Sequence, residues 1–227
     1  MMHSSRLRPP ATAKPPLVIF APFPPAKSGI ADYVAELMPH HVAEFDVTLV
    51  IADDAPLATE PGPRTLLASE YRHHRAFFED AVKLYHIGNN PQHCYMLDLI
   101  ERDPGIIVLH DFNLGYLHEM ATLRWGRRES YDRAMEREYG GLGREIVRCH
   151  AENGYREIFA GYELPLNGHV LENATAVITH SRQVQYKVAA RIPRTPVWYV
   201  AHHLSPLTAS YSGLSRSAAR KLTGIPS

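Results

Sequence analysis

The segment PLVIFAPFPPAKSGIADYVAEL (residues 16–37) predicts the fold of this chain. It begins with a short, continuous apolar run from Leu17 to Phe20, which is typical of a strand buried on both faces. Prolines and Lys27-Ser28-Gly29 then predict a turn. Ser28 is a suitable N-cap for a following helix, whose apolar face would carry Ile30, Tyr33, Val34, Leu37 and Met38. The segment therefore predicts a strand, a turn and a helix.

Similar apolar runs recur along the chain, at residues 46–52, 82–88, 105–111, 174–181 and 195–201. Helical patterns separate most of them, and this alternation implies right-handed crossovers between parallel strands. The predicted fold class is α/β, a Rossmann-like, doubly wound and mostly parallel sheet. Pro39 is expected to end or kink the first helix. Asn90 is expected to cap a helix that begins at Pro91.

The interval after the predicted fourth core strand, about residues 112–173, is too long for a simple crossover. Its charged middle predicts a helical insertion over one end of the sheet, with two or three helices broken at Gly140-Gly141 and Gly154. The predicted organisation is a flexible arm (1–15), a Rossmann-like domain (16–212) and the start of an interdomain linker or C-terminal domain (213–227).

Composition limits the compartment and the partners. The 227 residues carry a formal net charge of zero, so no global attraction to nucleic acid or anionic membranes is expected. No apolar run approaches the roughly 18 to 20 residues that cross a bilayer, and the N-terminus lacks a signal-peptide core. Cys94 and Cys149 are interpreted as buried, reduced thiols. These features predict a cytoplasmic protein without a transmembrane segment, and leave peripheral membrane contact open.

Polar groups follow several of the predicted strands. In an open α/β sheet, ligands bind outside the carboxyl ends of the strands, so these groups are expected to lie close together. They are Lys27 to Gly29, His86 to Asn90, His110 to Asn113, and His180-Ser181.

Gly29 and His110 each allow two interpretations. Gly29 could let a phosphate approach the free N–H groups of a helix start, or could simply complete a tight loop. His110 could donate or accept a hydrogen bond with a polar ligand, or could be a surface or capping group. Asp111 would point to the opposite face of its strand, so the two are not expected to chelate one metal.

Other chemistries lack their sequence signatures. No strand precedes a G-x-G-x-x-G motif, and neither a Walker phosphate loop nor a G-x-S-x-G elbow is present. The histidine pairs 40–41, 73–74 and 202–203 lack the i, i+4 spacing of a helical metal site, and no cysteine pair accompanies them. The sequence therefore predicts no metal site.

Three segments together resemble the N-terminal domain of GT-B glycosyltransferases of the retaining, group 4 type. They are PPAKSGIADYVAEL (24–37), LYHIGNNPQHCYMLDLIERDPGIIVLHDFNLGYLHE (84–119) and ATAVITHS (174–181). The resemblance implies a nucleotide-sugar donor as co-substrate and an acceptor hydroxyl of unknown identity, with no cofactor and no metal. The sugar would be transferred with retention of its anomeric configuration.

The resemblance also implies roles by position. Ser28 and Gly29 would contact the donor diphosphate, and His110 would hydrogen-bond a hydroxyl of the donor sugar. The implied acceptor or sugar contacts are Asn89, Asn90, Asp111, Asn113 and Ser181.

A GT-B enzyme has a second Rossmann-like domain that holds the nucleotide, a basic pair and an E-x7-E motif. Glu36 and Glu44 have that spacing, but they lie on the first predicted helix and its continuation across Pro39 and are interpreted as surface charges. One hypothesis is therefore an acceptor-side half that is inactive alone and needs a C-terminal GT-B domain in cis or in trans. The alternative is a non-catalytic, stand-alone binding or interaction module.

Overall fold

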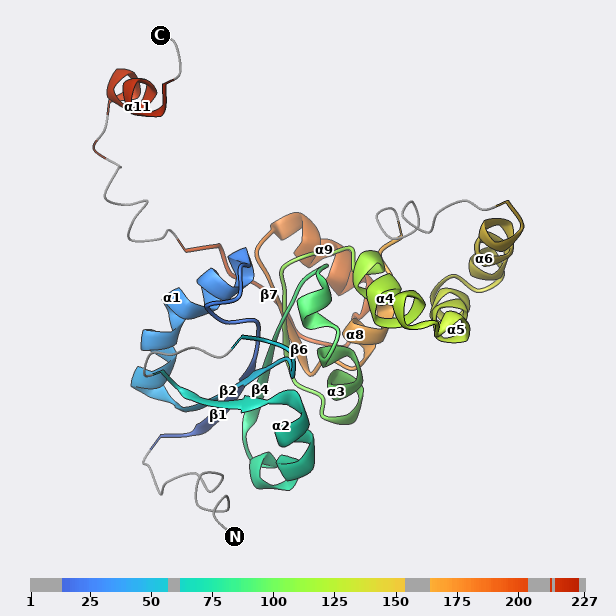
Figure 1. The fold of residues 1–227 in the computed structure, drawn as a ribbon, viewed down its shortest axis with the longest axis horizontal. Helices are drawn as coiled ribbons and strands as arrows, with labels where there is room; N and C mark the ends of the chain where they lie inside the picture. Colours follow the sequence, from blue (N-terminus) through green and yellow to red (C-terminus); the bar gives the residue numbers. More distant parts are fainter. Residues whose placement is uncertain (1–13, 57–61, 154–163, 204–212, 214, 225–227) are drawn as a thin grey trace.

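The computed structural model describes residues 14–56, 62–153, 164–203, 213 and 215–224. These residues form a seven-stranded sheet in which every strand pair is parallel, in the order β3-β2-β1-β4-β5-β6-β7 (Figure 1). The strands are β1 (Pro16–Phe20), β2 (Asp46–Ile51), β3 (Arg64–Leu67), β4 (Val82–Ile87), β5 (Ile106–Leu109), β6 (Ala176–Thr179) and β7 (Val197–Tyr199). The predicted α/β, doubly wound fold class is confirmed.

Helices connect the strands and cover both faces of the sheet. The α-helices are α1 (Gly29–Glu44), α2 (Ala68–His74), α3 (Met96–Arg102), α4 (Gly115–Thr122), α5 (Arg128–Tyr139), α6 (Gly141–Asn153), α8 (Gly168–Glu172), α9 (Arg182–Arg191) and α11 (Arg216–Thr223). Short 3₁₀ segments are η2 (Arg75–Phe78), η3 (Pro91–His93) and η4 (Leu123–Trp125). No helix within the described ranges is both long enough and apolar enough to cross a membrane.

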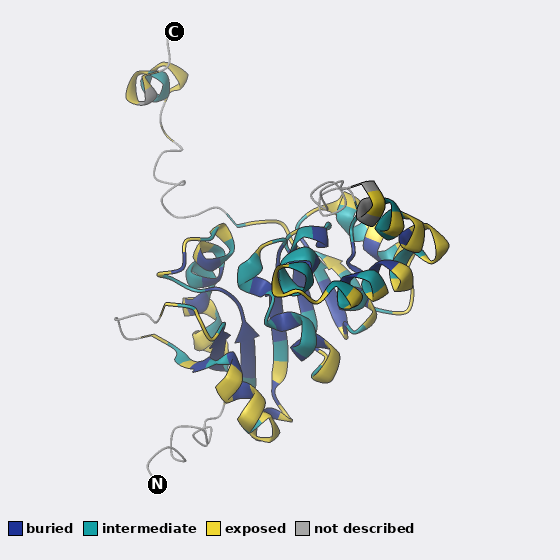
Figure 2. Ribbon diagram, turned by 45° about the vertical axis from the view of Figure 1, so that its right-hand side comes forward, coloured by how far each residue is buried: buried dark blue, intermediate teal, exposed yellow. Residues whose placement is uncertain are grey.

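The apolar side chains form a core on each face of the sheet. On one face, strand residues such as Ile19 and Leu84 pack against Val34 and Met38 of α1. On the other face, α2, α3 and α9 cover a larger core. The aromatic rings of Phe20, Tyr71 and Tyr85 pack against one another within it. Figure 2 shows the strands as the most buried part of the molecule, with exposed residues on the outer sides of the helices. Burial on both faces explains why most strands are continuous apolar runs.

Two expectations about individual elements need correction. Strand β3 was not predicted, because it is a short edge strand with a mixed pattern, RTLL, and only Leu66 is buried. Arg64 of β3 forms an ion pair with Asp46 of β2 at 3.3 Å. The first helix continues past Pro39 to Glu44, so the expected end at Pro39 is wrong and the alternative, a kink there, stays a prediction. Burial of Met38, in the turn before the proline, holds the helix against the sheet, and such packing supplies most helical stability in proteins.

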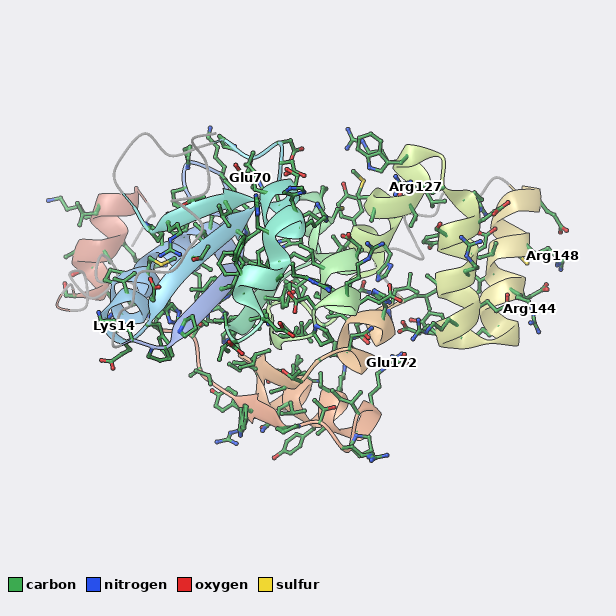
Figure 3. All side chains as sticks on the ribbon, turned by 90° about the horizontal axis from the view of Figure 1, so that it is seen from below. Lys14, Glu70, Arg127, Arg144, Arg148 and Glu172 are labelled. Atoms are coloured by element: carbon green, nitrogen blue, oxygen red, sulfur yellow. The ribbon has the colours of Figure 1, made fainter. Side chains whose placement is uncertain are left out.

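The interval after β5, which is the predicted fourth core strand, is helical as expected. It contains α4, α5, α6 and α8, and α5 is separated from α6 at Gly140, whose φ is 57°. The predicted break at Gly154 lies outside the described residues. Figures 1 and 3 show that α5 and α6 extend sideways, away from the sheet, rather than over its end. Arg148 and Glu152 form an i,i+4 ion pair along α6, and Arg144 of α6 pairs with Glu136 of α5. Exposed pairs of this kind stabilise helices only slightly.

The predicted domain boundaries stay predictions. The sheet begins at Pro16, as expected for the start of the Rossmann-like domain, and residues 1–13 of the predicted arm lie outside the described residues. At the other end, α11 lies away from the sheet in Figure 1.

Candidate functional site

The strand order places a switch point between β1 and β4. The chain moves from β1 toward β2 and β3 on one side, and from β4 toward β5, β6 and β7 on the other. In doubly wound sheets, the loops at such a point diverge and leave a crevice at the carboxyl edge, where ligands bind. Here the two loops are residues 21–28 after β1 and residues 88–90 after β4. The predicted site residues belong to this edge of the sheet.

Gly88 brings the loop after β4 against the start of α1. A Cβ atom at this position would lie 2.5 Å from Ile30 Cδ1 and 2.9 Å from Asp111 Oδ2. A side chain at position 88 would therefore have to displace the ends of these two side chains. Because Ile30 lies in the first turn of α1 and Asp111 follows β5, the starts of three connections meet around one glycine.

Ser28 caps α1, as the sequence predicts. Its Oγ accepts a hydrogen bond from the N–H of Ile30 at 3.3 Å. Gly29 is the first residue of the helix and is exposed, and a Cβ atom there would meet nothing within 4 Å. An open hollow of about 540 Å³ lies here, lined by residues 24–29 and Asp32. Lys27 and Asp32 give it side chains of both signs, so the helix N-terminus would supply the attraction for an anion.

Four histidines converge beside this loop because the strands are in register. His86 lies in β4, His110 follows β5 and His180 follows β6. Leu109 pairs with Thr179, so His110 and His180 come next in the same row, and His86 is on the same α1-facing side of the sheet. His202 follows β7. On the side of the sheet that faces α1, the apolar core residues are therefore followed, at the carboxyl edge, by a group of imidazole rings.

Tyr33 of α1 lies at the centre of these rings. Its ring centroid is 5.1 Å from that of His110, 5.2 Å from that of His180 and 5.2 Å from that of His202. His203 is also close, at 4.7 Å, and its Nε2 lies 2.5 Å from Glu36 Oε2 on the next turn of α1. Tyr33 thus connects the helix that begins at Gly29 with the strand ends that carry the histidines.

Hydrogen bonds restrict the tautomers of these histidines. His86 Nδ1 lies 3.1 Å from His110 Nε2, so one of the two rings donates to the other. His180 Nδ1 lies 2.8 Å from the carbonyl oxygen of Val200 and donates to it. The Nε2 atoms of His86 and His180 are buried and have no hydrogen-bond partner among the described residues. Such buried, unpaired nitrogens are unusual and call for an explanation.

Burial keeps three of these histidines, His86, His110 and His180, neutral. It lowers the pKa of His110 to about 3, with a further contribution from neighbouring His180. Burial likewise lowers the pKa of His180 and of His86. At neutral pH these rings carry no charge, so they can accept through a lone pair or donate one N–H, but do not act as cations.

The four predicted acceptor contacts on the loops after β4 and β5 have backbone partners within the chain. The Asp111 carboxylate accepts from the N–H of Asn89 at 2.7 Å. The side-chain oxygens of the three asparagines each accept from a backbone N–H, in the pairs Asn89–Leu117 (2.9 Å), Asn90–Gln92 (2.9 Å) and Asn113–Gly115 (2.8 Å). The Asn90 cap is confirmed, although the helix it opens is the 3₁₀ segment η3. Contact of these residues with an acceptor stays a prediction.

Ser181 is the N-cap residue of α9 and is exposed next to His180. Its side chain makes no capping hydrogen bond, and its carbonyl oxygen accepts from Thr179 Oγ1 at 3.2 Å. The Ser181 hydroxyl therefore lies at the same edge as His180. Its predicted contact with a sugar or acceptor stays a prediction.

Sequence reasoning missed Tyr33 and His202 as members of this site. Tyr33 was interpreted as part of the apolar face of the helix, and His202 only as one of a pair of adjacent histidines. The alternation of side chains along parallel strands could have indicated the cluster, since His86, His110 and His180 all follow the same face. These histidines lie at the ends of different strands, so spacing along a single helix does not reveal them.

A second, larger hollow lies elsewhere. It has a volume of about 720 Å³ and lies among α3, α4, α5 and α8, where charges of both signs line it, including Glu101, Arg133 and Glu138. It is separate from the switch point, and none of the predicted site residues lines it.

The fold and the carboxyl-edge site define a Rossmann-like, doubly wound α/β protein. No protein-family model matches the chain, and a search of curated proteins finds no significant match.

Proposed function

We propose that this chain is the acceptor-side half of a retaining glycosyltransferase, which transfers a sugar from a nucleotide-sugar to an acceptor hydroxyl together with a C-terminal domain in cis or in trans. The resemblance of its three sequence segments supplies the reaction class. The observation that carries the proposal is the meeting of α1 and His110 at one edge. Tyr33, four residues after Gly29, lies 5.1 Å from the His110 ring.

Gly29 would contact the donor diphosphate through the backbone of the first helical turn. The N–H groups of a helix start and the helix dipole favour a phosphate. The absence of any atom within 4 Å of a Cβ at Gly29 supports this role, because the fold itself does not need glycine there. A side chain would instead occupy the space that the diphosphate requires.

His110 would orient the donor sugar as a neutral hydrogen-bonding group. Its lowered pKa keeps the ring uncharged at neutral pH, and its contact with His86 Nδ1 couples the tautomers of the two rings. A neutral imidazole can position a hydroxyl of the sugar. A protonated imidazole would repel the positive charge that develops at the anomeric carbon in the transition state.

The openness of the edge favours the enzyme half over a stand-alone module. A module that has lost its chemistry would be expected to cover this edge. Gly29, Ser181 and His202 are exposed, and α5 and α6 of the 112–173 interval extend away from the sheet (Figure 1). In GT-B architecture, an uncovered edge is where the second domain closes over the donor.

The proposal is tested by supplying the second domain. The chain would be co-expressed with a polypeptide that carries a basic pair and an E-x7-E motif, either encoded after Ser227 or as a separate chain. Release of nucleoside diphosphate from a panel of nucleotide-sugars would be measured. We expect activity with both halves together, and neither activity nor micromolar nucleotide-sugar binding with this chain alone.

Gly29→Trp tests the site within that assay, with Gly62→Trp as the matched control. A Cβ at Gly62 also meets nothing within 4 Å, and Gly62 lies just before the amino end of β3. We expect Gly29→Trp to abolish transfer and Gly62→Trp to leave it unchanged, with both variants folded by circular dichroism. Unchanged turnover in Gly29→Trp would remove Gly29 from the site.

A further inference from the structure

Three histidines at the carboxyl edge have an arrangement that their hydrogen bonds do not explain. A ring nitrogen from each of His110, His180 and His202 lies within 4.8 Å of the corresponding nitrogens of the other two. The ring centroids of His180 and His202 are 4.0 Å apart, and those of His110 and His180 are 5.0 Å apart. Three imidazole nitrogens are thus brought together without a carboxylate among them.

His180 shows the feature expected of a metal ligand. Histidines that bind metals donate their other ring N–H to a carbonyl or carboxylate, which fixes the tautomer. His180 donates from Nδ1 to the Val200 carbonyl, so its lone pair is on Nε2. That Nε2 atom is buried and has no hydrogen-bond partner in the described part of the chain.

We propose that His110, His180 and His202 form a binding site for a divalent transition-metal ion, with Zn²⁺ as its representative. Three imidazoles and one open position are a common zinc coordination set. Zn–N bonds of about 2.0–2.1 Å place tetrahedral ligand nitrogens roughly 3.3 Å apart, so the rings need only small rotations to close around the ion. His202 is exposed and lies beyond the end of β7, where such a rotation is least restricted.

The elements that carry these ligands are held before any ion arrives. His110 and His180 directly follow paired strands, and the N–H of Val200 donates to the Thr179 carbonyl at 2.9 Å, which extends the β6–β7 pairing toward His202. A nearly formed site lowers the cost of binding, because little of the backbone must be ordered. The nitrogen ligands select borderline metals such as Zn²⁺ over Mg²⁺, which prefers oxygen.

The metal site shares His110 with the proposed function, so an ion bound to that ring would compete with its role toward the donor sugar. The two proposals are tested by separate measurements. Metal binding is measured on this chain alone, without a nucleotide-sugar or a second domain. Failure of one proposal therefore leaves the other standing.

The experiment uses the untagged full chain, since a polyhistidine tag would itself bind the ion. The chain is stripped with a chelator and titrated calorimetrically with Zn²⁺, and in parallel with Co²⁺, whose visible absorption reports tetrahedral coordination. We expect one Zn²⁺ per chain, a tetrahedral Co²⁺ spectrum and no binding of Mg²⁺. Absence of Zn²⁺ binding at micromolar concentration would overturn the proposal.

Single variants identify the ligands. We expect His202→Ala and His180→Ala to weaken Zn²⁺ binding more than about 100-fold, which exceeds the 10–100-fold typical of losing an outer hydrogen-bond partner. His203→Ala and His73→Ala are matched controls: His203 contacts Tyr33 and Glu36, and His73 is exposed on α2. Both should bind Zn²⁺ as the unaltered chain does.

Folding does not obscure this comparison. His202 is exposed, so its variant should keep the circular dichroism spectrum of the parent even if the more buried His180 variant does not. Unchanged Zn²⁺ affinity in folded His202→Ala would show that the ion binds elsewhere and would overturn the assignment.

Discussion

Gly29 and Gly88 lie at the same edge of the sheet and have opposite surroundings. A Cβ at Gly29 would meet open space, whereas one at Gly88 would overlap Ile30 and Asp111. A side chain at position 88 would have to displace the ends of these two side chains, whereas one at position 29 would displace no atom of the described residues. The two positions therefore predict different effects for the same substitution.

Gly88→Ala should destabilise the protein. The added methyl group would have to displace Ile30 Cδ1, at 2.5 Å, and the Asp111 carboxylate, at 2.9 Å. Overpacking of this kind costs about 1–3 kcal/mol, measured as the free energy of unfolding in urea. Gly29→Ala is the control and should change that free energy by less than about 0.5 kcal/mol. Equal stability of the two variants would contradict the close approach.

At the scale of single residues, the sequence indicates part of the site. Ser28, His110 and His180 are recognisable because they follow apolar runs directly. The positions of Tyr33 and His202 depend on where a helix face and a chain segment beyond β7 lie in space, which local pattern does not encode. The close contact at Gly88 is equally invisible, since a glycine after a strand is also common in ordinary turns.

Among the elements, α5 and α6 form a tightly packed pair because of one glycine. Gly143, in the first turn of α6, is buried, and a Cβ there would lie 2.1 Å from the carbonyl oxygen of Met135 in α5. The backbones of the two helices approach each other at this point. Charged side chains such as Arg144 and Arg148 extend outward from the pair (Figure 3).

Gly143→Ala should separate α6 from α5 and leave the sheet intact. We expect faster amide hydrogen exchange throughout α6, with exchange in β1, β4 and β5 unchanged, because local opening of a peripheral unit does not require global unfolding. Gly141→Ala is the matched control, since its Cβ would meet only Arg144, at 3.9 Å. If both variants exchange alike, the contact with Met135 does not hold the helix pair together.

The predictability of an element depends on how strongly burial determines its sequence. Strands β1, β2 and β4 are apolar throughout most of their length because helices cover both faces, so the sequence predicts them. Edge strand β3 has fewer buried positions and no such run. Pro39 predicts an end or a kink of the first helix because proline has no N–H to donate within it. Packing of buried Met38 in the neighbouring turn outweighs the loss of that hydrogen bond, and the helix continues.

For the whole molecule, several buried histidines link stability to pH. Burial lowers the pKa of His93 to about 4 and that of His118 to about 4. The Nε2 atom of each is buried without a partner among the described residues, so protonation would place an unpaired charge in the interior. Burial also lowers the pKa of His86, His110 and His180, so these three histidines act in the same direction.

Stability should therefore fall on acidification between about pH 6.5 and 4. In this window the unfolded chain, with ordinary histidine pKa values, binds protons that the folded chain excludes, so the full stability is present above pH 6.5. Each group contributes a slope of roughly 1.4 kcal/mol per pH unit. Urea unfolding at pH 7.5 and 5.0 measures the loss.

His118→Gln removes one titrating group and should reduce this pH dependence. His73→Gln changes an exposed histidine and should leave the dependence as it is. If both variants lose as much unfolding free energy between pH 7.5 and 5.0 as the unaltered chain does, burial of His118 does not contribute to the pH dependence.

The parallel arrangement has a consequence for the order of events in folding. Leu17 of β1 pairs with Val82 of β4, so the centre of the sheet joins segments that are far apart along the chain. Contacts of such long sequence separation carry a large loop-closure entropy and tend to form slowly. Tyr33 belongs to the half that precedes this seam and the histidines to the half that follows it. Until the seam closes, Tyr33 cannot reach the rings of His110, His180 and His202, so the cluster around this tyrosine is completed only in the assembled sheet.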